Sequence, residues 1–208
     1  MRFGSLVLLA ALAAIGFTAE ATPTKPERQG AKPTRFLPPV LSDEWTKWIV
    51  GEWEGSGEGS AGKGKGTVTI ELALSGQFLI HRGRAEITAL DPDYLKKHMH
   101  ASDEEIKRFK RTGYQGMEVY TIDQKTGEVV GFLFDNLRCI ATGRGKREGW
   151  NETVEWDWGN GQKSTRVTER ASEDRMVVIE RTPNPDGSVM EDKGDMKRIK
   201  RQSVSTKQ

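Results

Sequence analysis

His81 and Glu152 are the residues whose types and positions best fit chemistry inside a protein. His81 lies in a segment, residues 78–89, that alternates apolar and polar side chains, which is typical of a β-strand with one buried face. On the apolar face it is joined by Leu79, Gly83, Ala85 and Ile87. A histidine on such a face either completes a hydrogen-bonded core or contacts a bound ligand.

Glu152 belongs to a second alternating segment, residues 150–158, in which one face carries three tryptophans. The residues of that face are Trp150, Glu152, Val154, Trp156 and Trp158. An unpaired polar group on a buried face costs about 1–3 kcal/mol, so a partner or a ligand must satisfy this carboxylate. We therefore predict an inward cavity whose ligand-binding residues are His81, Trp150, Glu152 and Trp156.

Two chemical uses of such a cavity can be distinguished. A binding site would use the tryptophans to hold an apolar body and the polar residues to orient the ligand's polar end. An enzyme would use His81 and Glu152 as an acid–base pair, but nothing in their spacing specifically supports catalysis. The remaining histidines, His98 and His100, lie in a charged segment where exposure to solvent is expected. The sequence therefore predicts no catalytic residue and no metal site.

The elements that position these residues are expected to be β-strands. Gly recurs at every second position after Trp53, at residues 55, 57 and 59. Because successive side chains of a strand point to opposite faces, these glycines leave one face bare, as in a strand that bends or meets another backbone closely. Further alternating segments follow, separated by turns such as Asn160-Gly161. This pattern predicts an all-β fold, a single antiparallel up-and-down β-barrel of about ten strands.

Two helical regions accompany the predicted strands. Residues 42–50 are expected to form a short helix capped by Ser42, with Trp45 and Trp48 on one face. Residues 91–112 form a helical insert that contains the capping box Ser102-x-x-Glu105. An insert between two strands of a barrel lies at a rim, where it acts either as a lid over the interior or as a plain connection.

The N-terminus has the pattern of a secretory signal peptide. Arg2 precedes an apolar run at residues 6–15, and Ala19-Glu20-Ala21 supplies a cleavage pattern. The run is shorter than the ~20 residues of a membrane anchor, so residues 1–21 are predicted to be removed. A Pro-rich linker follows at 22–40, then the barrel at 41–201 and a tail at 202–208. We expect an exported protein, periplasmic or secreted, without integral membrane association after cleavage.

The distribution of charge argues against nucleic acid as a partner. The net charge of the chain is +2, and the linker holds four basic residues against one acidic residue. The predicted barrel is therefore close to neutral, whereas nucleic-acid binding depends on concentrated positive charge. The expected partner is a small apolar molecule, and the oligomeric state stays open.

The first and last predicted strands carry a family resemblance. Residues 48–57, Trp-Ile-Val-Gly-Glu-Trp-Glu-Gly-Ser-Gly, and the terminal strand that ends Met196-Lys197-Arg198-Ile199 after Asp186-Gly187 resemble the calycin-like barrels of a widespread exported bacterial family without an assigned function. These barrels are similar to lipocalins, fatty-acid-binding proteins and the haem barrel nitrobindin. The resemblance covers residues 41–201. It implies that Trp53 closes one end of the barrel by packing.

The resemblance leaves three interpretations of function. The first is an exported β-barrel that binds a small, largely apolar ligand, with no catalysis and no cofactor expected. The second, implied by nitrobindin, is a haem-binding barrel, but that family takes its iron ligand from a late His and no His follows His100 here. The third is a purely structural envelope protein.

Overall fold

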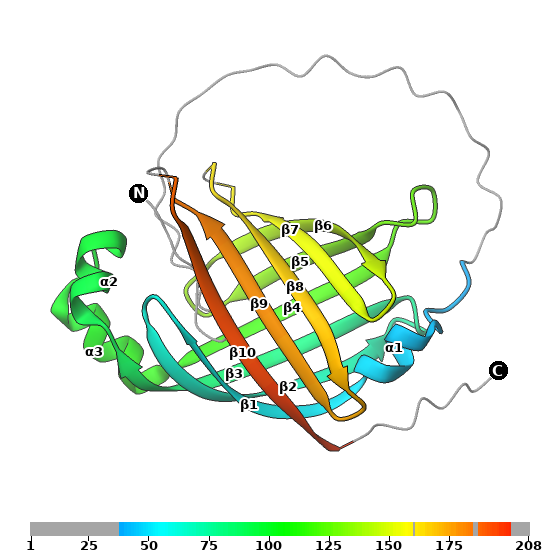
Figure 1. Ribbon diagram of the computed structural model, residues 1–208, viewed down its shortest axis with the longest axis horizontal. Helices are drawn as coiled ribbons and strands as arrows, with labels where there is room; N and C mark the ends of the chain where they lie inside the picture. Colours follow the sequence, from blue (N-terminus) through cyan, green and yellow to red (C-terminus); the bar gives the residue numbers. More distant parts are fainter. Residues whose placement is uncertain (1–37, 160, 185–186, 201–208) are drawn as a thin grey trace, which may run out of the picture.

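The protein is a closed barrel of ten antiparallel strands (Figure 1). The computed structural model describes residues 38–159, 161–184 and 187–200. Each strand pairs with its neighbours in the chain, and the last strand pairs with the first, so the topology is up-and-down. The strands are β1 (Gly51–Gly59), β2 (Gly62–Ala73), β3 (Phe78–Leu90), β4 (Tyr114–Ile122), β5 (Val129–Asp135), β6 (Ile140–Glu148), β7 (Asn151–Asp157), β8 (Lys163–Ser172), β9 (Arg175–Pro183) and β10 (Val189–Lys200). The predicted fold class is confirmed.

The glycines of β1 allow the barrel to close. A Cβ atom at Gly55 would lie 2.0 Å from the backbone oxygen of Asp195 on β10, and one at Gly59 would lie 1.8 Å from Oδ1 of Asp192. Neither approach is possible for a real side chain, so the bare inner face of β1 is what lets β10 come this close. The close approach that the glycine spacing predicted is therefore present.

A short helix, α1 (Glu44–Ile49), lies at one end of the barrel (Figure 1). Its N-cap is Asp43 rather than the expected Ser42, because the Asp43 carboxylate accepts the backbone N–H of Thr46 at 2.9 Å. The helix packs its indoles on the barrel, where the rings of Trp48 and Trp53 are 5.4 Å apart. Trp53 is fully buried and donates its Nε1–H to the Ile49 oxygen, so it closes this end.

The insert between β3 and β4 forms two helices, α2 (Pro92–Met99) and α3 (Asp103–Thr112), at the opposite end (Figure 1). The predicted capping box of α3 is present, since Ser102 and Glu105 satisfy each other's backbone N–H groups. Leu95 of α2 is buried, and the backbone N–H of Asp91 bonds to the oxygen of Ala61 in the β1–β2 turn. The insert is therefore fastened to the barrel end. Whether it moves as a lid stays a prediction.

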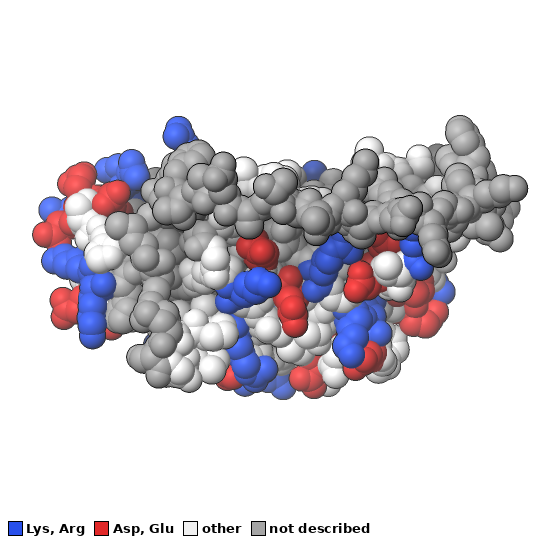
Figure 2. All heavy atoms as spheres, turned by 90° about the horizontal axis from the view of Figure 1, so that it is seen from above, with Lys and Arg blue, Asp and Glu red and all other residues white. Residues whose placement is uncertain are grey.

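The outer wall is polar and mixed in charge, with Lys and Arg interspersed among Asp and Glu on the face seen in Figure 2. Pairs such as Lys63–Glu58 and Arg175–Asp195 join neighbouring strands on the outside. None of the helices that the structure describes is long and apolar enough to cross a membrane. The predicted signal peptide, most of the linker, the tail and the turn residues Asn160 and Asp186 lie outside the described residues.

Candidate functional site

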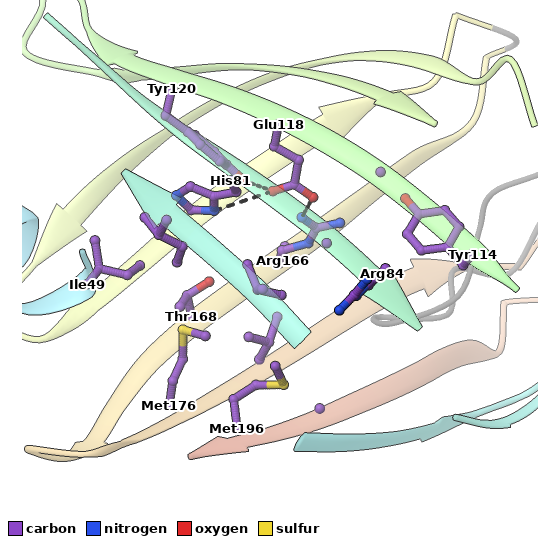
Figure 3. A pocket seen from close by; sticks show the side chains of 16 residues that line it. Ile49, His81, Arg84, Tyr114, Glu118, Tyr120, Arg166, Thr168, Met176 and Met196 are labelled. Atoms are coloured by element: carbon purple, nitrogen blue, oxygen red, sulfur yellow. Dashed lines mark hydrogen bonds and ion pairs between the residues drawn. The ribbon is translucent and has the colours of Figure 1, made fainter. Parts of the chain in front are cut away.

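The barrel interior contains a cavity of about 90 Å³ (Figure 3). Residues of α1 and of six strands, β2, β3, β4, β8, β9 and β10, reach it, so its wall is assembled from most of the chain. None of the insert residues that the structure describes lines it. The wall consists of Ile49, Val68, Ile70, His81, Gly83, Arg84, Tyr114, Gly116, Glu118, Tyr120, Arg166, Thr168, Met176, Val178, Gly194 and Met196.

His81 enters this cavity from β3, as the alternation of that strand predicted. Its side chain is 14% exposed, and its Nδ1 lies 3.9 Å from Oε2 of Glu118, its direct partner on β4. Burial lowers the pKa of His81 to about 4; the negative Glu118 opposes this shift, and Arg166 adds to it. The ring is therefore neutral at physiological pH. Its other nitrogen, Nε2, is buried and has no hydrogen-bond partner among the described residues.

Arg166 on β8 connects two interior carboxylates. It donates to Oε1 of Glu118 at 2.6 Å, and its Nε and Nη2 donate to Oε2 of Glu180 at 3.0 and 2.9 Å. Burial alone would raise the pKa of Glu118, but Arg166, His81 and the Tyr120 hydroxyl together outweigh burial and hold it below its usual value. The two carboxylates keep Arg166 charged, since they raise its pKa although burial opposes this.

Aromatic groups complete the polar side of the cavity. The hydroxyl of Tyr120 donates to Oε2 of Glu118, and its ring lies 4.7 Å from the His81 ring and 5.9 Å from that of Trp156. Arg166 lies over the Trp156 ring at 5.2 Å. Burial raises the pKa of Tyr120 well above its usual value, so the phenol stays a donor to Glu118. Every oxygen of Glu118 is therefore engaged by the protein.

The opposite side of the cavity is apolar. Met176 and Met196 lie across it from Glu118 and Tyr120 (Figure 3), and the apolar side chains of Ile49, Ile70 and Val68 also line the cavity. Between the two sides, Gly83 on β3 and Gly116 on β4 are direct cross-strand partners and add no side chain. A Cβ atom at Gly83 would find its nearest neighbour, Cγ2 of Val68, only at 3.7 Å. The cavity exists because this part of the wall is bare.

Tyr114 and Arg84 mark the boundary between the cavity and the outside. Both line the cavity, and both also line a groove on the outer surface across β10, β1, β2 and β3. The Tyr114 hydroxyl lies over Gly116, 2.5 Å from where a Cβ atom would be. Movement of this ring would open the cavity towards the groove.

Glu152 lies elsewhere in the interior, at the α1 end of the barrel. It is buried, and Nε of Arg147, its direct cross-strand partner, donates to it at 2.7 Å. Nη1 of Arg147 donates in turn to Thr46 of α1 at 3.1 Å. Burial raises the pKa of Glu152, although Arg147 opposes the shift. No hydrogen bond or ion pair joins Glu152 to His81 within the described chain, so the hypothetical acid–base pair is wrong, because Arg147 occupies the carboxylate.

Trp150 is wrongly placed by the sequence prediction. It is 41% exposed and lies in the turn before β7, which begins at Asn151. The turn carries its indole to the outside of the barrel end, where Arg170 stacks on it at 3.8 Å. Trp150 therefore does not line the cavity. Trp156, by contrast, is fully buried on the inner face of β7 and reaches the site through Tyr120 and Arg166.

The residues that sequence reasoning missed are Glu118, Tyr120 and Arg166. Hydrophobic alternation points the wrong way on β4, because Met117 and Val119 of the outer face are more apolar than Gly116 and Glu118 of the inner face. Cross-strand register is the signal that finds them. Once β3 and β4 are paired, Glu118 stands directly opposite the inward His81.

The comparisons with known proteins found similarity to solved structures and not to a family or a curated sequence. No family model matches the chain, and no curated protein matches it. A redesigned β-barrel, mFAP1, bound to DFHBI aligns with 12% identity and a TM-score of 0.40 over 75% of this chain and 100% of that one. The S-type phycobiliprotein lyase CPES from Guillardia theta aligns with 11% identity and a TM-score of 0.46 over 77% of this chain and 92% of that one. At TM-scores below 0.5 we draw no functional conclusion from these alignments.

Proposed function

We propose that this protein is a binding barrel that holds a small ligand with a largely apolar body in the interior cavity. The observation that carries the proposal is the two-sided wall, apolar at Met176 and Met196 and polar at His81, whose buried Nε2 has no partner in the part of the chain that the structure describes. An apolar cavity with a few placed polar groups is the usual form of a small-molecule site.

The size of the cavity limits the ligand. Sites for drug-sized molecules occupy about 300–1,000 Å³, whereas an engineered cavity of about 150 Å³ takes benzene. The cavity here, about 90 Å³, is closer to the second case. A single ring or a short branched molecule fits it, and an extended fatty-acid chain does not.

The small volume of the cavity also argues against haem as the ligand. His81 presents a free ring nitrogen, which is the ligand type that haem iron takes. However, the side chains of Tyr120, Met176 and Met196 bound the space on both sides of the ring, and about 90 Å³ does not accommodate a macrocycle. The interior as described therefore does not fit haem. A Soret band in protein purified from its native source would contradict this.

Export remains part of the proposal and is supported by the sequence alone. The signal-peptide pattern at residues 1–21 places a cleavage after Ala21. Intact-mass measurement of the exported protein should find Thr22 as its first residue. Retention of Met1 in that material would contradict export by this route.

Calorimetric titration with toluene and phenol tests the binding function directly. The wild-type protein should bind at least one of them saturably, at one molecule per chain. Gly83→Val serves as the matched variant, because it adds a side chain where the wall is bare and strands accept valine readily. It should fold and lose binding, and Gly83→Ala should show an intermediate loss.

Absence of saturable binding for both probes in the wild-type protein would contradict the binding function. The alternative of a structural envelope protein would then be favoured. Equal binding by wild type and Gly83→Val would place the ligand outside this cavity and would also contradict the proposal.

A further inference from the structure

The protonation of His81 specifies what a ligand must supply. A neutral imidazole has one N–H donor and one lone pair, on different nitrogens. Nδ1 faces the Glu118 carboxylate at 3.9 Å, and a carboxylate accepts hydrogen bonds without donating them. The proton is therefore assigned to Nδ1. The lone pair is left on Nε2, which is buried and without a donor among the described residues.

The two donors that contact Glu118, opposite His81, are already committed to the protein. Arg166 donates to Glu118 and Glu180, and the Tyr120 hydroxyl donates to Glu118. A buried acceptor without a donor costs about 1–3 kcal/mol, which a ligand with a donor group would recover. The unsatisfied atom therefore selects for one kind of polar group.

The charges of the site exclude ionised ligands of both signs. An anion would meet Glu118 and Glu180, which share the single positive charge of Arg166. A cation would be disfavoured for the same reason that His81 is neutral. Burial and the positive Arg166 lower the pKa of that imidazole more than Glu118 raises it. Both kinds of charge would also be desolvated in a cavity with a wall of methionine, valine and isoleucine.

We propose that the cavity selects a small, uncharged molecule that carries a hydroxyl or N–H group on an apolar body, and that this group donates to Nε2 of His81. Phenol, small alcohols and small lactams belong to this class. The apolar body would lie on the bare wall at Gly83, facing Met176 and Met196. The inference rests on the proposed binding function and names its ligand class.

A double-mutant comparison with phenol and toluene separates the donor from the rest of the ligand. The two probes differ by a hydroxyl in place of a methyl group, and His81→Leu removes the acceptor. The ratio of the two dissociation constants should shift by about tenfold towards toluene in His81→Leu, which corresponds to about 1.4 kcal/mol of hydrogen-bond coupling. Both proteins bind the same two probes, so comparing the ratio between wild type and His81→Leu cancels the cost of taking the phenol hydroxyl out of water.

Tyr94→Phe is the matched control, since it deletes a hydroxyl from α2, outside the cavity lining, and leaves the His81 lone pair in place. It should leave the phenol-to-toluene ratio unchanged within about twofold. Retained toluene binding shows that each variant still forms the site. Benzoate and benzylamine at pH 7 test the exclusion of charge, and both should bind more weakly than phenol.

The outcomes separate the inference from the function on which it rests. If His81→Leu leaves the ratio unchanged, the donor to Nε2 is an ordered water and the inference is wrong, although the binding function stands. A ratio that shifts in Tyr94→Phe as much as in His81→Leu would also overturn it, as would tighter binding of benzoate or benzylamine than of phenol. Failure of all probes to bind the wild type would contradict the binding function itself.

Discussion

Two regions of the barrel interior contain the same residue types but use them for different purposes. At the α1 end, Arg147 pairs with Glu152 and with Thr46, and Arg198 donates to the backbone oxygens of Val50 and Trp48. In the central cavity, Arg166 pairs with Glu118 and Glu180, beside His81. Each region has an arginine held by buried acceptors. The α1 end has large indoles around it, whereas the cavity has glycines.

The difference shows how a small barrel can separate closure from binding. Around Arg147 and Arg198, the indoles of Trp45, Trp48 and Trp53 fill the space. Beside His81, Gly83 leaves space, and Nε2 of His81 faces the cavity without a hydrogen-bond partner among the described residues. Charged groups in the first region stabilise the fold. In the second they also fix the protonation of the group that we propose contacts the ligand.

The largest expected effect comes from breaking the ion pair at the closed end. Arg147→Met leaves the Glu152 side chain, 5% exposed, without its counter-charge. Loss of one partner of a buried pair typically costs about 3–5 kcal/mol of unfolding free energy. Urea unfolding measures it. Arg144→Met on the same strand is the control, because Arg144 is 63% exposed and its pair with Glu128 should contribute less than about 1 kcal/mol. Equal losses in both variants would contradict the distinction.

Two glycines test whether the regions differ in packing. Gly55→Ala places a Cβ atom 2.0 Å from the Asp195 backbone oxygen, so β1 or β10 must move. We expect a loss of about 1–3 kcal/mol in unfolding free energy. Gly83→Ala meets nothing closer than 3.7 Å, and it should be neutral or stabilise by about 0.5–1 kcal/mol. Thermal melts of both variants measure these changes in stability. Destabilisation by Gly83→Ala that equals that of Gly55→Ala would show the cavity wall to be as tightly packed as the closure.

The smallest effect is a pH dependence that belongs to the cavity. The pKa of His81 is lowered from 6.5 to about 4 by burial, so between these values the unfolded chain binds more protons than the folded one. Stability from this group is therefore lost as pH falls from about 6.5 towards 4, by up to about 1.4 kcal/mol for each pH unit. His81→Leu should remove this slope. Urea unfolding of both proteins at pH 7, 6 and 5 measures it, and parallel curves would show that His81 is not buried and neutral.

The sequence predicted the barrel and a part of its interior correctly. Period-two alternation gave the inward faces of β3 and β7 and thus His81, Glu152 and Trp156, because burial on one face imposes that period. The alternation placed Trp150 wrongly, because the pattern continues from the turn into β7 and does not mark the residue at which the strand begins. It failed also at Glu118, because the outer face of β4 carries Met117 and Val119 and therefore looks like the buried one.

What the sequence determined by itself is local: the strand period, the glycines that let β1 and β10 meet, and the capping box of α3. These depend on backbone geometry within a few residues. The tertiary structure alone decided which charges pair, that Arg147 rather than His81 holds Glu152, and where the cavity lies. Those outcomes depend on residues far apart in the chain, such as Glu118 and Arg166. Only the closed register of ten strands brings them together, and within residues 38–159, 161–184 and 187–200 it leaves Nε2 of His81 without a partner.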